Sequence, residues 1–155
     1  MDTGRLEILK IDIKRQLEVI QNIYDKIQQR CQNYQNNEER MESLAYQLHN
    51  LYCAFEDLMV IVANNFENQI YESPDWHIRL LKRMTEDITN IRPSLFSDEC
   101  YPLLDELRSF RHWFRHAYSY QIDQEKLGIV LRKSLKLNEL YKNDVQRFMD
   151  LLCQK

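Results

Sequence analysis

The sequence predicts an all-α protein, an antiparallel bundle of four long helices plus a short helix. Its 155 residues include only 2 glycines and 3 prolines, whereas a strand-rich fold of this size needs many tight turns and the residues that form them. Apolar residues recur at alternating spacings of three and four, which is the pattern of helices that bury one face. Hydrophobic residues make up 44% of the chain, enough for a core at this length, so we expect residues 1–155 to form a single domain.

The first two helices are expected over about residues 3–34 and 38–68. The apolar seam of the first consists of Ile13, Leu17, Ile20, Tyr24, Ile27, Cys31 and Tyr34, and that of the second of Met41, Leu44, Leu48, Leu51, Phe55, Leu58 and Val62. The stretch 35–37, Gln-Asn-Asn, separates them, because asparagine is a poor helix-interior residue and a good cap. Two long amphipathic helices with a short connection should pack antiparallel.

Three polar residues lie near the seam of the second helix: His49, Asn50 and Glu56. Each can project toward a site on a later helix, or it can lie at the solvent edge of the bundle. The sequence does not decide between these two orientations.

A short third helix is expected over about residues 74–89, after a connection at residues 69–72. Ser73 is a good N-cap, and Pro74 suits the first helical position. One side of this helix is basic and carries His77, Arg79, Lys82 and Arg83. That side is either a solvated face or an extension of a phosphate-binding surface. A second loop is expected at residues 90–96.

The last two helices are expected over about residues 98–118 and 124–152, with a break at residues 119–122. The expected N-caps are Ser97 or Asp98 for the first and Asp123 for the second. The seam of the final helix consists of Leu127, Leu131, Leu135, Tyr141, Val145, Phe148 and Leu152.

Charge and cysteine content exclude several classes of protein. The net charge of −3 gives no overall basic field, so any binding of nucleic acid must come from a local patch. The cysteines are Cys31, Cys53, Cys100 and Cys153. They are dispersed, which predicts reduced thiols rather than a zinc or disulfide framework.

The N-terminus lacks a secretory pattern, and the longest apolar run, residues 58–63, is too short to cross a bilayer. We therefore expect a cytoplasmic protein without a membrane partner.

The strongest functional signal is the stretch 108–118, Arg-Ser-Phe-Arg-His-Trp-Phe-Arg-His-Ala-Tyr. On an ideal helix, with ~100° per residue, one face carries Arg108, Arg111, Arg115 and Tyr118, and beside it His112 and His116 stack one turn apart. The opposite side carries Leu103, Leu107, Phe110, Trp113, Phe114 and Ala117. We therefore expect this helix to bury an aromatic side and to expose a cationic side.

The cationic side suits the cleavage of RNA, which carries its own nucleophile, the 2′-hydroxyl. Histidine moves protons near neutral pH, and the planar fork of arginine binds phosphate oxygens. Arg111 and His116 are ~140° apart on an ideal helix, but both side chains are long enough to reach one phosphate. A single His116 cannot easily act as both base and acid. Two copies facing each other in a dimer would supply a pair of histidines.

Other interpretations are weaker. His112 and His116 have the spacing of two zinc ligands, but no glutamate lies between them and Arg115 would repel a cation. No serine or cysteine has the context of a nucleophile, and there is no glycine-rich phosphate loop. Favourable charges at a helix end would explain one or two of the cations, but not the whole group.

The eight residues 111–118 match the pattern R-x4-H-x-Y, and on them the chain resembles the HEPN superfamily, in particular the HepT-like ribonuclease toxins of prokaryotic toxin–antitoxin pairs. The polar residue after the arginine, His112, agrees with the same pattern. The all-α layout, the length and the late position of the motif agree as well. The resemblance implies a HEPN-like fold and a metal-independent endoribonuclease that acts as a homodimer and needs no cofactor.

The resemblance also implies residue roles. Arg111 and His116 would be catalytic and His112 would support them, while an MNT-type nucleotidyltransferase antitoxin would attach AMP to Tyr118. Arg108 and Arg115 lie outside the motif, and we assign them to the RNA backbone. The expected partners are RNA and the antitoxin, but not DNA. The alternative is a non-catalytic helical module of HEPN type that binds RNA or protein.

Overall fold

The computed structural model describes residues 1–67, 73–119 and 121–154. Its helices are α1 (Thr3–Arg30), α2 (Glu38–Phe66), α3 (Trp76–Met84), α4 (Cys100–Arg115) and α5 (Gln124–Cys153). Within these described ranges there is no strand, and the only sheet-like pairing is an isolated bridge between Ile88 and Arg92. The prediction of an all-α bundle is therefore confirmed.

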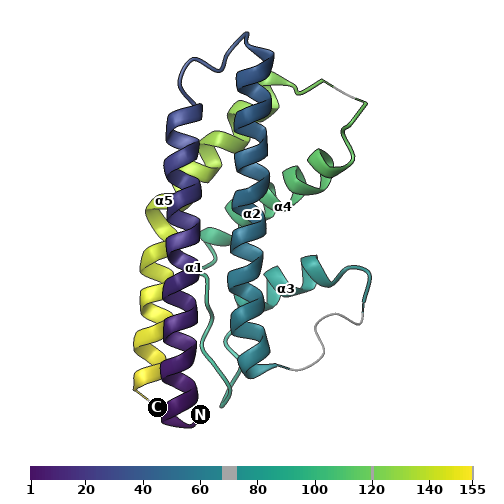
Figure 1. Cartoon of the computed structure of the whole chain (residues 1–155). Helices are drawn as coiled ribbons and strands as arrows, with labels where there is room; N and C mark the ends of the chain where they lie inside the picture. Colours follow the sequence, from purple (N-terminus) through teal and green to yellow (C-terminus); the bar gives the residue numbers. More distant parts are fainter. Residues whose placement is uncertain (68–72, 120, 155) are drawn as a thin grey trace.

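Three long helices, α1, α2 and α5, lie side by side and form the body of the molecule (Figure 1). The chain runs up α1 and returns down α2, and it later runs down α5, so both termini lie at the same end. The shorter helices α3 and α4 pack against α2 and against each other, and α4 also packs against α5. This arrangement brings two short helices together at the side of α2.

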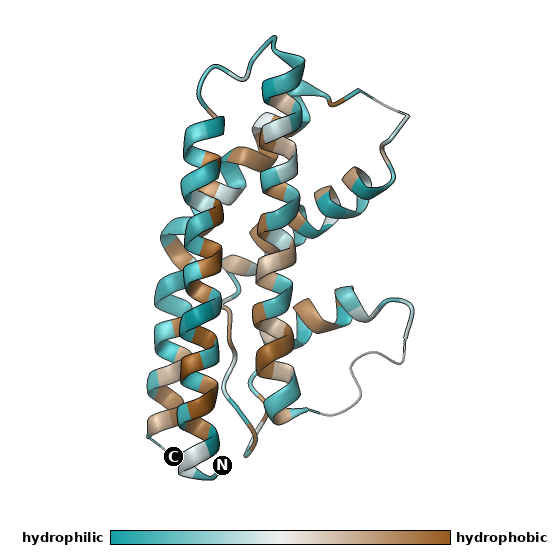
Figure 2. Ribbon diagram, in the orientation of Figure 1, coloured by the Kyte–Doolittle hydropathy of each residue, from teal (hydrophilic) through white to brown (hydrophobic). Residues whose placement is uncertain are grey.

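The core follows the predicted seams. Hydrophobic residues line the sides on which α1 and α2 face each other (Figure 2). In the middle of the bundle the ring of Tyr24 stacks on Tyr141 with centroids 5.8 Å apart, and Phe55 meets both rings edge-on. The Tyr24 hydroxyl donates a hydrogen bond of 2.8 Å to the carbonyl of Ser134. Buried tyrosine hydroxyls usually find such an acceptor, and this contact joins α1 to α5.

Two of the predicted N-caps are confirmed. Asn37 caps α2 by accepting from the Arg40 amide. Asp123 caps α5 by accepting from the amides of Glu125 and Lys126. The carboxamide and carboxylate oxygens thus satisfy amides that have no partner within the helix.

Other predicted boundaries were wrong. α1 ends at Arg30, four residues early, and α3 begins at Trp76 and ends at Met84, so it is shorter than predicted at both ends. Ser73 does not cap α3, because its hydroxyl bonds the Asp75 carboxylate and Asp75 takes the N-cap position. The connection predicted at residues 69–72 lies outside the described residues.

The start of α4 also differs from the prediction. Ser97 donates both its amide and its hydroxyl to the carboxylate of Asp144 on α5, at 2.8 and 2.7 Å. A residue held in this way cannot cap α4 with its side chain. The N-cap position is Glu99, which makes no capping hydrogen bond with its side chain, and α4 begins at Cys100 instead of Asp98.

In the described part of the chain, none of the helices combines the length and the apolar character that a membrane-spanning segment needs.

The loop after α3 is fixed by a buried arginine. Arg92 is 1% exposed, and its guanidinium bonds the carboxylate of Glu67 and three backbone carbonyls, those of Arg83, Glu86 and Pro93. A buried charge is stable only when it is paired and fully hydrogen-bonded. This cation therefore joins the end of α2 to the segment between α3 and α4.

We predict that Arg92→Met lowers the free energy of unfolding by about 3–5 kcal/mol, because it leaves Oε1 of Glu67 and three carbonyls without their donor. The matched control is Arg83→Met. Arg83 forms an ion pair with the same carboxylate at 3.1 Å, but its side chain is 53% exposed, and a pair with a solvated cation contributes about 0–1 kcal/mol. Urea denaturation measures both variants, and equal losses would contradict the assignment.

Candidate active site

The helix that carries the motif ends earlier than predicted. α4 stops at Arg115, and His116 is its C-cap, with φ −110° and ψ 6°. The amide of His116 bonds the carbonyl of Trp113, and the amide of Ala117 bonds the carbonyl of Phe114. Such three-residue bonds tighten and close the last turn of a helix. Tyr118 therefore lies beyond the helix, and the prediction that it shares a helical face with the three arginines was wrong.

Arg111 points into the protein rather than toward solvent. Its side chain is 13% exposed, its Nη1 lies 3.5 Å from Glu56 Oε2, and its guanidinium carbon lies 5.8 Å from the centre of the Tyr52 ring. Both partners belong to α2. The expected solvated position of Arg111 was wrong because α2 offers an aromatic face and a carboxylate that together take up the guanidinium. Among the described residues, the buried Nε atom of Arg111 has no hydrogen-bond partner.

Of the polar residues His49, Asn50 and Glu56, it is Glu56 whose side chain contacts both α3 and α4. The residue is 6% exposed. The same oxygen, Oε2, that faces Arg111 of α4 also lies 2.6 Å from Nδ1 of His77 on α3. A buried carboxylate needs partners of this kind. Glu56 therefore fixes α3 and α4 relative to each other at the side of α2.

The histidines of the motif lie on the outside, as predicted. The rings of His112 and His116 are 4.9 Å apart and meet edge-on, and both residues are exposed. Arg115 is exposed beside them. Arg108 differs, because its guanidinium pairs with Asp105 at 2.8 Å and its side chain is only 19% exposed. The exposed cationic surface thus consists of His112, Arg115 and His116.

The aromatic side of α4 is buried as predicted. Phe110 is 1% exposed, and Trp113 and Phe114 are partly buried against the core. Phe114 also contacts the ring of His49 on α2, with centroids 5.2 Å apart. Burial, with smaller contributions from the guanidinium groups of Arg111 and Arg115, lowers the pKa of His49. A hydrogen bond to Asn50 acts in the opposite direction.

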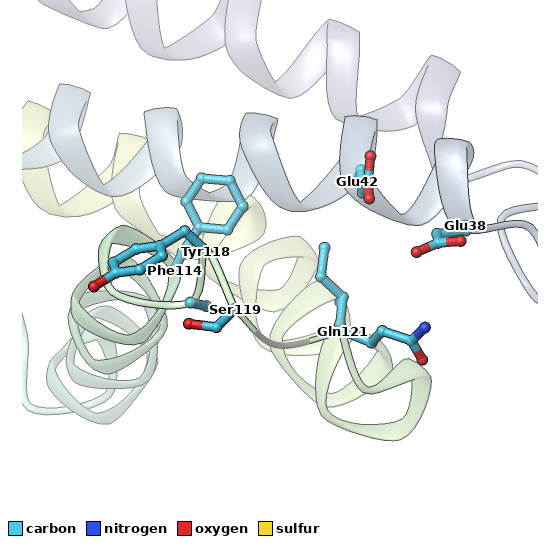
Figure 3. A pocket seen from close by; sticks show the side chains of 8 residues that line it. Glu38, Glu42, Phe114, Tyr118, Ser119 and Gln121 are labelled. Atoms are coloured by element: carbon cyan, nitrogen blue, oxygen red, sulfur yellow. The ribbon is translucent and has the colours of Figure 1, made fainter.

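Tyr118 lies on the rim of a surface hollow and is 93% exposed. The hollow has a volume of about 590 Å³ and is lined by Glu38, Glu42, Phe114, Ala117, Tyr118, Ser119, Gln121 and Ile122. In Figure 3 the Tyr118 hydroxyl points away from Glu38 and Glu42. The phenol is therefore open to solvent, while acidic side chains of α2 lie at the far side of the hollow.

The sequence pattern did not identify two contacts of the site. Tyr52 was not singled out, and His77 was treated only as one of four basic residues on α3. No local spacing joins them to Arg111, because the contacts run between helices. Among the described residues, no cluster of three or more His, Cys, Asp or Glu side chains could hold a metal ion.

Comparison of the sequence with known protein families finds a match. A family model described as "HepT-like protein" matches residues 43–152, which include α2 from its second turn, α3, α4 and nearly all of α5. No curated protein and no solved structure is significantly similar to the chain.

Because the pKa of His49 is lowered in the folded protein, we predict how its folding stability depends on pH. Below the ordinary histidine pKa of ~6.5, the unfolded chain binds a proton at His49 that the folded protein binds only at lower pH. Folding stability must then fall as the pH drops from about 7 toward 5. The variant His49→Gln should lose less stability than the wild type over this range. Thermal melts at a series of pH values measure the difference, and parallel curves would contradict it.

Proposed function

The chain belongs to the HepT-like family of the HEPN superfamily, and from this premise we propose that it is a metal-independent endoribonuclease toxin. In the proposal, residues 1–155 form one HEPN-like domain that acts in the cytoplasm on RNA. The observation that carries the proposal is the position of Arg111 and His116 at the end of one helix, five residues apart, with an exposed cationic surface between and around them.

The chemistry needs no metal. His116 takes the proton of a 2′-hydroxyl, whose oxygen then attacks the adjacent phosphorus. Arg111 stabilises the charge that builds on the phosphate oxygens. Its charge is only partly balanced by the described residues, because Glu56 lies 3.5 Å from Nη1 and shares the same oxygen with His77. A substrate phosphate would offer the exposed part of the guanidinium a closer acceptor.

The exposed residues around this pair have supporting roles in the proposal. His112 contacts the His116 ring edge-on and would fix its orientation. Arg115 is exposed and would contact the RNA backbone, whereas Arg108 would have to leave Asp105 in order to do so. Because His116 lies on the surface, a second copy of the chain can place its own motif opposite the first. We therefore propose that the active form is a homodimer.

Tyr118 is the proposed control point. An MNT-type nucleotidyltransferase antitoxin would attach AMP to its phenol, which is 93% exposed and lies two residues after His116. A modifying enzyme can reach such a side chain without unfolding the protein. The attached nucleotide adds bulk and negative charge beside His116 and Arg115, so it would exclude RNA by steric and electrostatic repulsion.

We predict that the wild-type protein cleaves RNA in the presence of a metal chelator, and that His116→Ala lowers the rate at least about 10²-fold because a proton-transfer group is lost. Lys136→Ala, at an exposed position on α5, is the control and should retain wild-type activity. Gel electrophoresis of the RNA measures the rates. Equal survival of the RNA with wild type and His116→Ala would instead support the non-catalytic binding module.

A second prediction concerns Tyr118. Incubation with a cognate MNT-type nucleotidyltransferase and ATP should add AMP to the wild-type protein and to Tyr46→Phe, but not to Tyr118→Phe. Tyr46 is the matched control, because it is also an exposed tyrosine, 54% accessible, but lies on α2. Intact-mass spectrometry counts the added groups. Modification that persists in Tyr118→Phe would move the control point elsewhere.

A further inference from the structure

One carboxylate oxygen holds side chains from two helices. Glu56 Oε2 lies 2.6 Å from His77 Nδ1 and 3.5 Å from Arg111 Nη1. Two cationic or imidazole groups that bond the same oxygen are close enough to approach the same ligand. His77 is therefore part of the surroundings of Arg111, although the two are 34 positions apart in the sequence.

His77 is unlike the other basic residues of α3. Arg79 and Lys82 are exposed, and Arg83 pairs with Glu67 near the end of α2. Only His77 turns toward the carboxylate that α4 also uses. The basic side of α3 is thus mostly a solvated face, with one imidazole directed to the candidate site.

The contacts of His77 fix its ring. Nδ1 donates to a carboxylate that is itself buried, and the ring of Trp76 lies against the imidazole with centroids 3.7 Å apart. A carboxylate on one nitrogen sets the orientation of the ring and leaves the other nitrogen to exchange protons. The His77 side chain is 31% exposed. Over the described part of the chain, the structure gives its Nε2 atom no protein partner.

We propose that His77 is a second catalytic residue of the site, the proton donor to the leaving group, and that Glu56 positions it. The proposal rests on the proposed ribonuclease function. In the step, the 2′-oxygen forms a bond to phosphorus and its proton passes to His116. The bond from phosphorus to the 5′-oxygen breaks, and that oxygen takes a proton from Nε2 of His77. The products are a 2′,3′-cyclic phosphate and a free 5′-hydroxyl.

This assignment gives each copy in the proposed homodimer an acid as well as a base. Cleavage needs a base at the 2′-hydroxyl and an acid at the 5′-oxygen, and a single His116 cannot easily be both. With His77 as the acid, the donor does not have to be the His116 of a second copy. Arg111 lies beside Glu56 and would hold the phosphate whose leaving oxygen His77 protonates.

The test uses two substrates that differ in one atom. One is an RNA with a cleavage site mapped with the wild-type protein, and the other carries sulfur in place of the 5′-oxygen at that site. A thiolate leaves without being protonated, so the sulfur substrate does not need a general acid. His77→Gln should cleave the ordinary RNA about 10²–10⁴-fold more slowly than wild type and the sulfur RNA at nearly the wild-type rate. His116→Ala should be slow on both.

The control is Ile78→Gln, at the neighbouring exposed position of α3, which should match wild type on both substrates. Circular dichroism melts verify that each variant is folded, and His77→Asn replaces His77→Gln if the latter is not. Equal slowing on the two substrates would reduce His77 to a structural role, and wild-type rates on both would remove it from the site. A wild-type protein that leaves RNA intact would instead contradict the ribonuclease function itself.

Discussion

The arrangement of the candidate site depends on the buried carboxylate of Glu56. A charge at this depth is unfavourable unless cationic or hydrogen-bonding groups surround it, and the partners come from α3 and α4. This one residue of α2 therefore holds side chains of both short helices, beside the core packing that places them against α2. The same contact turns Arg111 inward and over Tyr52, which holds the guanidinium in one orientation. A fixed guanidinium is suited to stabilising charge that develops on a phosphate.

Much of the fold could be predicted from the sequence, because it depends on local patterns. The apolar spacings identified the helices, and Asn37 and Asp123 marked the starts of α2 and α5 as predicted. The predicted start of α4 was wrong because a distant residue binds the expected cap. Ser97 binds Asp144, which is 47 positions away, instead of capping α4. The predicted exposure of Arg111 was wrong for a similar reason. A helical projection shows which residues of one helix share a face, but it cannot show that Glu56 of another helix lies opposite Arg111.

The early end of α4 divides the eight-residue motif into three environments. Arg111 is held inside by α2, His116 closes the helix at the surface, and Tyr118 extends beyond it into solvent. A continuous helix would have placed the tyrosine beside the arginines. The observed break instead separates the groups proposed for cleavage from the group proposed for control, so that one can be modified without disturbing the packing of the other.

The most direct measurement of the central claim is the chemistry of the RNA ends. If the 2′-hydroxyl is the nucleophile and the side chains of this chain move the protons, mass spectrometry of the fragments made in the presence of a chelator will find 2′,3′-cyclic phosphates and 5′-hydroxyls. Fragments that instead carry 3′-hydroxyls and 5′-phosphates would show that water attacked the phosphorus, and they would contradict the account.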